Sequence, residues 1–336
     1  MLAFDVLSNE RAGLFILEKI QQKQNSTFAA WRFRGKLSLK ILAFYLVLFG
    51  VFLSLNCKSE TNQPQTIAQT REMVDDLGRR VKIPANVERA VSLAPNLTEI
   101  VFAVGAGDRL VGVTTYCDYP AQAREIRKIG DTINPNIESI IALKPQVVLV
   151  STASQIENFK NQLEAQNIAV FVTNPNSLED IYKSVERTGE IFGANENARK
   201  LVDNLKSRAA DIEARANKTE KVKVFLQISK ESLYTVGKDS FLTDLIRRAG
   251  GASVTGEVAS AYPKVSKETA LILNPEAIIL SESDDNREPN DVFKNSPAMK
   301  NGKVFHIGAD LLSRPGPRVV DGLEQMAKAL HPENFK

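Results

Sequence analysis

The sequence predicts an α/β protein with two lobes, each built on a central, mainly parallel β-sheet, and a single long α-helix that joins them. Short apolar runs rich in β-branched residues alternate with amphipathic helical stretches after Arg89, which is typical of βαβ units. One pattern occurs twice, because ESIIALKPQVVLV begins at Glu138 and ETALILNPEAIIL begins 130 residues later at Glu268. A helical stretch of about 22 residues without a breaker lies between the two copies. Two similarly built halves are therefore expected.

Residues 1–57 have the features of a leader that directs the chain to a membrane. A basic flank from Arg32 to Lys40 precedes a fifteen-residue uncharged run, Ile41 to Leu55. This run is shorter than the roughly 20 residues that span a bilayer comfortably, and Cys57 follows it, where a bacterial lipoprotein is cleaved and acylated. We expect a signal peptide with lipidation at Cys57 and a periplasmic or cell-surface location. An uncleaved signal anchor is the alternative, because Asn56 replaces the small residue that a lipobox prefers before its cysteine.

The composition is that of a globular protein without a strong charge bias. The chain has 336 residues, of which 43% are hydrophobic and 25% charged, and its formal charge is +3. The leader holds seven of the 43 basic and three of the 40 acidic residues, which leaves 36 and 37 in the rest of the chain. No basic stripe with interleaved aromatic residues is present, so a nucleic-acid partner is not expected. Two histidines and two cysteines are too few for a typical metal site, and we expect no metal and no intrinsic cofactor.

The first lobe is expected over residues 74–176, after a polar and aperiodic flexible tether at residues 58–73. The sequence MVDDLGRRVKIP predicts two short strands around a turn at Asp76 to Gly78. The predicted parallel strands are AVSLAP, RLVGVT, VVLVS and AVFVT, and the predicted helices are NLTEIVFAVGAG, the first copy of the repeat, and residues 155–166.

Residues 177–220 are predicted to form two helices, the second of which links the lobes. Ser177 is a candidate cap for a helix that stops at Gly193, and Asn195 is a candidate cap for the next helix. The second helix would run roughly 33 Å at 1.5 Å per residue, far enough to reach from one lobe to the other. Its apolar positions, from Ala198 to Ile212, form a stripe at helical spacing. A packing helix that serves one domain only is the alternative.

The second lobe is expected over residues 221–336 and repeats the order of the first. The predicted elements are the strand KVFLQIS, a loop through Gly237, the helix SFLTDLIRRAG, the second copy of the repeat, the strand KVFHIG and a last helix over residues 318–330. Two lobes joined by one helix leave a cleft between them, which is a usual place for a ligand. The cleft is therefore the predicted binding site.

Four segments together resemble a known family. They are VSLAPNLTEIVFAVGAGDRLVGVTTYCDYP, IESIIALKPQVVLV, AYPKVSKETALILNPEAIIL and SRPGPR. They are similar to the BtuF-like substrate-binding proteins of cobalamin (vitamin B12) ABC importers, over residues 74–334. The resemblance implies two Rossmann-like lobes bridged by a rigid helix, as in class III periplasmic binding proteins. It further implies a monomer that captures cobalamin or a related corrinoid and delivers it to a permease dimer. The wider superfamily includes haem and ferric-siderophore binders, which are the alternative.

The resemblance also assigns a role to the acid that opens each copy of the repeat. It implies that Glu138 and Glu268 dock onto arginines of the two transmembrane subunits of the importer. Two lobes with an acid at the same place can meet two equivalent basic sites at once, and exposed ion pairs of this kind orient and steer more than they bind. The alternative is that each glutamate only occupies the first turn of a helix, where the helix dipole favours a carboxylate.

The ligand site is predicted on loops that face the cleft from both lobes. Tyr116 and Tyr262 match family positions that contact ligand, and each offers an apolar face and a hydroxyl group. Asp310 and Arg314 match a family acid and base, although a local salt bridge between them is the alternative. Ser92, Pro95 and Asn96 follow the first strand of the sheet, and we expect them at the floor of the cleft, because ligands bind beyond the carboxyl ends of parallel strands.

Some residues depart from the family pattern or carry no function. Thr132 and Ser151 stand where family members place tryptophan, so the predicted pocket has lost aromatic surface. Cys117 is expected to be a free, inert thiol, and His306 is expected to be a core histidine. Catalysis is not expected, because the glycines of VGAGDRLVG follow a helix instead of a strand and no GxSxG elbow occurs.

Overall fold

The computed structural model describes residues 69–151 and 160–336. The described residues belong to one compact unit, Thr66–Lys336. The leader, Cys57, most of the expected tether and the first part of the helix predicted at residues 155–166 lie outside the described residues. No helix within the described ranges is long and apolar enough to cross a membrane.

A β-hairpin opens the described chain, as predicted from MVDDLGRRVKIP. Strands β1 (Thr70–Val74) and β2 (Arg80–Pro84) pair antiparallel, and the turn uses the positive φ of 74° at Gly78. Asp75 holds this turn, because its carboxylate accepts hydrogen bonds from the backbone N–H of Leu77 and of Arg79. The hairpin begins at Thr70, four residues before the predicted start of the lobe, so the tether was predicted too long at that end.

Each lobe contains a four-stranded parallel sheet with the same strand order. The strands of lobe 1 are β3 (Ala90–Ser92), β4 (Leu110–Val113), β5 (Val147–Ser151) and β6 (Ala169–Thr173). Those of lobe 2 are β7 (Val222–Gln227), β8 (Gly251–Ser253), β9 (Ala277–Glu282) and β10 (Val304–Gly308). The orders β4-β3-β5-β6 and β8-β7-β9-β10 are equivalent position by position. The predicted α/β fold with two similar halves is confirmed.

The repeated sequence folds in the same way in both lobes. It forms α4 (Ile137–Ala142) and β5 in lobe 1, and α9 (Lys267–Leu273) and β9 in lobe 2. Each helix ends before a residue with a left-handed backbone, Lys144 with φ of 47° and Asn274 with φ of 45°. The proline that follows each of these residues disfavours the right-handed helical conformation there, so both helices stop at the same place. The sequence repeat therefore reflects a repeated local structure.

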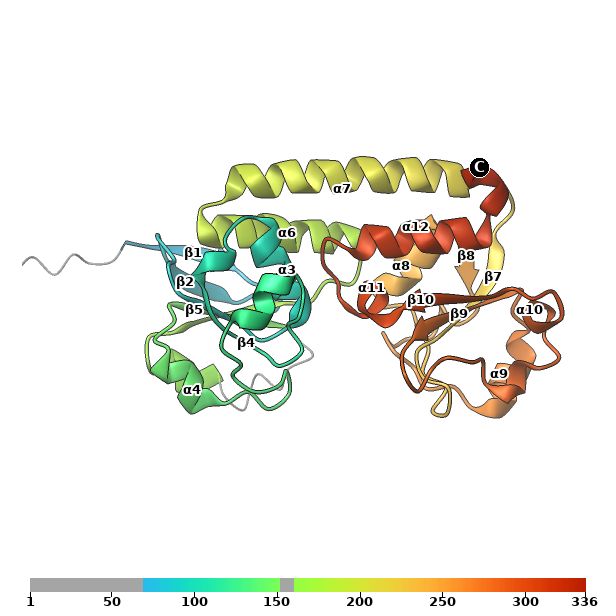
Figure 1. Cartoon of the computed structure of the whole chain (residues 1–336), viewed down its shortest axis with the longest axis horizontal. Coiled ribbons are helices and arrows are strands. Elements are labelled where there is room, and N and C mark those ends of the chain that lie inside the picture. The colour runs from blue at the N-terminus through green and yellow to red at the C-terminus, as the bar shows by residue number, and fades with distance from the viewer. Residues whose placement is uncertain (1–68, 152–159) are drawn as a thin grey trace, which may run out of the picture. The chain divides into compact units, whose positions relative to one another are not determined.

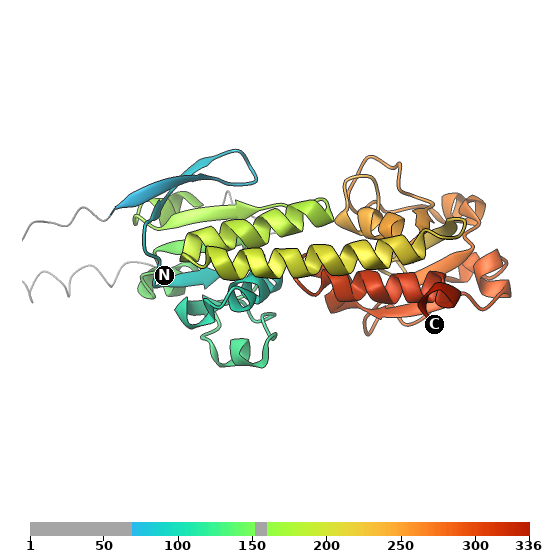
Figure 2. The same cartoon turned by 90° about the horizontal axis from the view of Figure 1, so that it is seen from above.

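A layer of helices covers one side of both sheets and contains the predicted linker (Figure 1). Its members are α3 (Pro95–Ala103), α6 (Leu178–Phe192), α7 (Asn195–Ala216), α8 (Phe241–Arg248) and α12 (Val319–Leu330). Helix α7 packs against α6 in lobe 1 and against α12 in lobe 2, so it spans both lobes (Figures 1 and 2). The alternative of a helix within one domain is wrong.

The ends of the two linker helices follow mostly from local signals. Ser177 caps α6 by accepting a hydrogen bond from the N–H of Asp180, and α6 ends at Gly193 with φ of 67°. The cap predicted for α7 is one residue off, because Ala194 is the cap and Asn195 is the first helical residue. The predicted stripe is buried at five positions, Ala198, Val202, Leu205, Ala209 and Ile212. Burial of that stripe against two lobes explains why an otherwise polar helix is stable there.

The apolar core beneath the helix layer is continuous from one lobe to the other. One cluster of buried residues extends from Met73 in the hairpin to Leu330 in the last helix and includes the α7 stripe. Two smaller clusters fill the opposite faces of the sheets, one in each lobe. The shorter helices are α5 (Lys160–Glu164), α10 (Pro297–Lys300) and α11 (Ala309–Ser313). Shared core and shared helix join the lobes in one folded body.

Candidate functional site: the cleft between the lobes

A cavity of about 620 Å³ lies between the two lobes. Lobe 1 supplies residues at the ends of β5 and β6, where parallel strands commonly present ligand groups. Lobe 2 supplies the loops after β7 and β8, the start of α8, the end of strand β9 and the end of α11 with the residues after it. The lining residues are Ser151, Asn174, Pro175, Asn176, Ile228, Tyr234, Asp239, Phe241, Leu242, Ala261, Tyr262, Ser281, Leu312, Ser313 and Pro315. The predicted cleft is therefore present, and its volume is that of a small-molecule site.

The two walls of this cavity differ in chemistry. Lobe 2 contributes the aromatic side chains of Tyr234, Phe241 and Tyr262, whereas lobe 1 contributes Ser151 and a short segment around Pro175 with an asparagine on either side. Tyr234 and Tyr262 are 43% and 47% exposed, so they offer ring surface to a ligand. Burial raises the pKa of Tyr262 and outweighs a hydrogen bond with Ser240, so this side chain is a neutral phenol at physiological pH. The site suits a flat ligand with polar groups at one edge.

The loop that carries Tyr262 is held by a close backbone contact. Gly237 donates its N–H to the carbonyl of Ala261 at 3.0 Å, and Lys238 donates to that of Val258 at 2.9 Å. A Cβ atom at position 237 would collide with the carbonyl oxygens of Ser260 and Val258. Glycine is therefore required for this approach, and it positions one wall of the cavity.

The described lining of the cavity carries almost no charge. Asp239 is the one charged residue among the described residues that line the cavity, and none of them is Lys, Arg or His. Residues 152–159, TASQIENF, which follow Ser151 in sequence, contain no basic residue either. A ligand with free carboxylates would lose its hydration here without gaining a cation. The lining favours a ligand whose polar groups are uncharged.

Arg314, predicted to contact ligand, is not among the lining residues of the cavity and lies in a cluster of charges. Its guanidinium is within 3.2 Å of Glu99, 2.7 Å of Asp118 and 2.8 Å of Asp310, and its side chain is 11% exposed. The local pair with Asp310 that the sequence suggested as an alternative is thus present. Burial alone would lower the pKa of Arg314, but its hydrogen bonds and the three carboxylates raise the pKa by more than burial lowers it. The guanidinium therefore stays charged. Three acids neutralise this cation before any ligand arrives.

The other predicted ligand residues are not among those that line the cavity. Ser92 is fully buried, donating to the carbonyl of Ala94 and accepting from Thr98. Pro95 is the first residue of α3, and Asn96 is 5% exposed and donates to the carbonyl of Pro315 in the other lobe at 3.3 Å. Tyr116 is 61% exposed on the loop after β4. The structure places these residues without testing a contact with ligand, so their roles stay predictions.

Cys117 lies in the environment that was predicted for it, whereas His306 does not. Cys117 is 1% exposed and lies 3.1 Å from the hydroxyl groups of Thr98 and Thr114, which suits a free, inert thiol. His306 was predicted as a core histidine, and this prediction is wrong. It lies on the edge strand β10, its side chain is 43% exposed, and its Nδ1 is 3.8 Å from Glu282. An edge strand leaves one side uncovered, which a strand pattern in the sequence does not reveal. Within the described ranges, no cluster of His, Cys, Asp and Glu is arranged to hold a metal ion.

The two repeated glutamates occupy equivalent exposed positions. Glu138 lies in the first turn of α4 and Glu268 in the first turn of α9, after the caps Asn136 and Ser266. The helix-end hydrogen bonds lower the pKa of Glu268, so this carboxylate is ionised across the physiological range. Helices α4 and α9 lie on the side of the lobes away from α7 (Figure 1). Both acids are therefore available to a partner.

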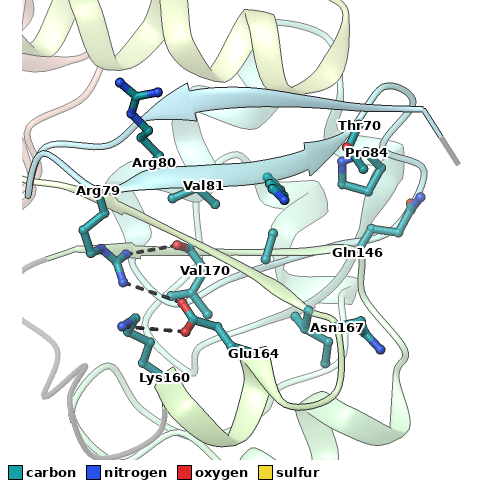
Figure 3. A pocket seen from close by; sticks show the side chains of 13 residues that line it. Thr70, Arg79, Arg80, Val81, Pro84, Gln146, Lys160, Glu164, Asn167 and Val170 are labelled. Carbon is teal, nitrogen blue, oxygen red and sulfur yellow. Dashed lines mark hydrogen bonds and ion pairs between the residues drawn. The ribbon is translucent and has the colours of Figure 1, made fainter.

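A second cavity, of about 530 Å³, lies within lobe 1 between the hairpin and strand β6 (Figure 3). Arg79 extends across it, donates to the carbonyl of Val170 at 3.0 Å and lies 3.8 Å from Glu164, which is also paired with Lys160 (Figure 3). These contacts cover the free edge of β6, so Arg79 has a structural role. The cavity between the lobes is the better candidate, because aromatic and polar groups from two domains converge there.

Sequence reasoning identified Tyr262 and noted Ser151, but it missed most of the cavity lining. Asn174 and Asn176 follow β6 directly, so the rule on carboxyl ends of parallel strands would have found them. Tyr234 lies on a loop after β7 at the same edge of its sheet. Asp239 and Ser313 had no local signal, since only the meeting of two lobes brings them to the cavity.

Known proteins resemble this chain in sequence and in structure. Residues 91–311 match the family model described as periplasmic binding protein. An uncharacterized ABC transporter substrate-binding lipoprotein, YvrC, from Bacillus subtilis is 33% identical over 306 residues, covering 87% of this chain and 96% of the relative. A vitamin B12-binding protein from Vibrio parahaemolyticus is 30% identical over 254 residues, covering 74% of this chain and 91% of the relative.

Solved structures share the fold. The periplasmic vitamin B12-binding protein BtuF of Vibrio cholerae superposes with a TM-score of 0.65 at 26% identity, covering 75% of this chain and all of that one. The periplasmic haem-binding protein RhuT from Roseiflexus has the same TM-score at 21% identity, covering 74% of this chain and all of that one. The second match shows the fold alone. Binders of different ligands therefore share this architecture.

Proposed function

Since the chain belongs to the periplasmic binding protein family and is a substrate-binding protein of an ABC transporter, we propose that it captures cobalamin or a related corrinoid and delivers it to an importer. The ligand would occupy the cavity between the lobes. Lobe 2 would present Tyr234 and Tyr262 to the macrocycle, and lobe 1 would present Asn176 to the peripheral groups. The ligand contacts predicted for Tyr116, Asp310, Arg314, Ser92, Pro95 and Asn96 belong to the same proposal, and three acids already balance the charge of Arg314.

The observation that carries this proposal is the lack of a cation in the described cavity lining. The side arms of cobalamin end mainly in amides, which need hydrogen-bond partners and no counter-ion. Haem carries two propionates, and ferric siderophores are commonly anionic, so both would need Arg or Lys to compensate for lost hydration. Haem or siderophore binding is therefore the second candidate.

A spectrophotometric titration of the purified chain tests the ligand. Cyanocobalamin should bind with a saturable spectral change, and hemin should leave its Soret band unchanged. Tyr262→Ala removes a half-exposed ring from the cavity and should weaken cyanocobalamin binding about 10- to 100-fold. Val258→Ala, on the same loop and outside the lining, is the control and should bind as the wild type does. A large Soret shift with hemin and no uptake of cyanocobalamin would refute the proposal.

We further propose that Glu138 and Glu268 dock onto basic residues of the permease. Their equivalent places in the two lobes support this, because a dimeric permease presents two equivalent sites. Charge reversal of both residues to Lys should abolish uptake of cyanocobalamin by cells and leave its affinity for the purified protein unchanged. Reversal at Glu196, an exposed residue of α7, is the control and should leave uptake intact. Loss of ligand affinity in the double variant would instead place these acids in the binding site.

The N-terminal assignments are also proposals. A signal peptide over residues 1–57 with lipidation at Cys57, a tether that ends before Thr70, and lobes divided near residues 177–220 fit the family. The relative from Bacillus subtilis is named a lipoprotein, which supports an anchor on the outer face of a membrane. No catalytic role is proposed.

A further inference from the structure

Two clusters of ion pairs join the lobes, one on each flank of α7. We propose that Glu99 and Asp244, the acids at their centres, are positioning residues that clamp the lobes and set the width of the ligand cleft. Helices α12 and α8, which carry the lobe 2 side of the two clusters, lie on opposite flanks of α7 (Figure 2). The effect on ligand binding rests on the proposed function, whereas the effect on cleft width does not.

The first clamp joins α3 of lobe 1 to the start of α12 in lobe 2. Glu99 accepts two hydrogen bonds from Arg318, at 2.6 and 2.9 Å, and one from Arg314 at 3.2 Å. Its side chain is 2% exposed, and Arg318 also packs against the ring of Tyr119 with 4.0 Å to the ring centre. A two-pronged contact with a buried carboxylate has one favourable geometry, so it fixes orientation as well as distance.

The second clamp joins the start of α6 to α8. Asp244 accepts a hydrogen bond from the backbone N–H of Leu178 at 3.2 Å and pairs with Arg248 at 2.9 Å. Arg248 in turn contacts Glu213 of α7 at 3.0 Å and lies 3.8 Å from Glu179 of α6. The side chains of Asp244 and Arg248 are 17% and 16% exposed. This clamp therefore ties α8 to the linker helix and to the first turn of the helix before it.

Both clamps are attached directly to the walls of the cavity. Arg314 lies between two lining residues, Ser313 and Pro315, and Leu178 lies two residues after Asn176, which also lines the cavity. The helices that carry the clamps, α3, α6, α8 and α12, lie between α7 and the sheets (Figure 1). A swing of the lobes about α7 that widened the cleft would lengthen these contacts and leave charges with little access to water unpaired.

Because the clamps set the width of the cleft, they should also influence the affinity for the ligand. The proposed ligand has to contact Tyr234 and Tyr262 of lobe 2 and Asn176 of lobe 1 at the same time, so binding depends on how far the walls stand apart. If the binding arrangement falls to a tenth of the population, the apparent affinity falls tenfold. Weakening a clamp should therefore change cleft width first and affinity as a result.

Distance measurements between the lobes test the clamp without any ligand. Spin labels on Asn134→Cys, beside α4, and Lys267→Cys, in α9, report the separation of the two lobe ends farthest from α7, in a Cys57→Ser background. Glu99→Gln should broaden the distance distribution and lengthen its mean, and Asp244→Asn should do the same. Adding the second substitution to the first should broaden it further. Cyanocobalamin should bind the clamp variants about tenfold more weakly.

Asp75→Asn is the matched control. Asp75 has a fully buried carboxylate paired with Arg79 at 2.6 Å, but both residues belong to lobe 1, so the substitution should cost stability and leave the distance unchanged. Arg318→Lys keeps the charge and loses the two-pronged contact with Glu99. It replaces Glu99→Gln in the distance measurement if that variant does not fold, and the same broadening is expected. Distance distributions identical to the wild type in the clamp variants would overturn the proposal and assign lobe orientation to α7 and the common core. Wider distributions without cyanocobalamin binding in any form would support the clamp and refute the proposed ligand.

Discussion

Replacement of Gly237 by alanine should damage the ligand site more than the fold. The new methyl group would collide with the carbonyl oxygens of Ser260 and Val258, so the loop of residues 258–263 must move away. The move would strain or break the two backbone hydrogen bonds that hold this loop, from Gly237 to Ala261 and from Lys238 to Val258. Tyr262 lies on the displaced loop, which is why the effect should concentrate at the cavity.

The magnitude of the Gly237→Ala effect follows from these contacts. Two hydrogen bonds contribute about 0.5 to 1.5 kcal/mol each, and accommodating an extra methyl group in a packed site costs about 1 to 3 kcal/mol. A loop that stays in place keeps the hydrogen bonds and bears the collision, whereas a loop that moves loses the bonds, so we expect a loss of about 1 to 3 kcal/mol in either case. Movement of the loop relieves the collision, but it displaces Tyr262 and so changes the wall of the cavity. The melting temperature should then fall by roughly 4 to 10 °C at most.

The assay compares ligand affinity with stability in the same preparation. Cyanocobalamin titration should show a loss of tenfold or more for Gly237→Ala, while thermal unfolding monitored by circular dichroism shows a single cooperative transition. Gly308→Ala is the matched control, because a Cβ at that position meets nothing within 4 Å. Wild-type affinity and wild-type melting temperature in Gly237→Ala would refute the reasoning that this contact positions the wall.

Three further predictions concern other parts of the chain. Burial alone would raise the pKa of Asp118, but the hydrogen bond and the attraction to Arg314 outweigh it and lower the pKa below its usual value of 3.8. The pair with Arg314 therefore stabilises the fold above pH 3.8, and this contribution is lost as the pH falls through the lowered pKa. Unfolding measured between pH 5 and 2 should therefore show a smaller acid loss in Asp118→Asn than in the wild type, and equal losses would contradict it. Leu271 and Ile272 lie on the exposed face of α9 beside Glu268, and their side chains are 60% and 80% exposed, so they are free to bury against the permease. The double substitution Leu271→Ser with Ile272→Ser should therefore reduce cellular cyanocobalamin uptake about tenfold or more. Stability and ligand affinity should not change. Metabolic labelling with a radioactive fatty acid should mark the wild-type protein and not Cys57→Ser, with no change in cyanocobalamin affinity; a wild-type protein that takes up no label would favour an uncleaved anchor.

Elements specified by neighbouring residues were predictable from the sequence. The hairpin turn at Gly78, the cap at Ser177 and the stop at Gly193 depend on contacts within a few residues. The repeat was equally readable, since its acid, helix, proline and buried strand recur at fixed spacing. The shift of the α7 cap from Asn195 to Ala194 shows the limit of such signals, because two adjacent positions compete and packing of the helix decides between them.

Elements specified by distant residues were not predictable in the same way. From the sequence, Arg314 has an acid four positions away, and the local pair with Asp310 does form. Glu99, 215 residues away, and Asp118, 196 residues away, complete its surroundings and make Arg314 part of a bridge between the lobes, while its contact with ligand stays a prediction. The prediction that His306 is a core residue failed for a related reason, since the sequence pattern of a strand does not show whether that strand lies at the edge of its sheet.

The sequence by itself determined the two-lobed α/β fold, the long helix between the lobes and the equivalent exposed places of Glu138 and Glu268. These follow from periodicity, capping and duplication, which act over short stretches of chain. The tertiary structure decided which side chains line the cavity, that no described lining residue carries a positive charge, and that Glu99 and Asp244 bind groups across the lobes. A cavity between lobes is made by segments far apart in the chain, so its chemistry exists only once both lobes are folded and packed beneath one helix.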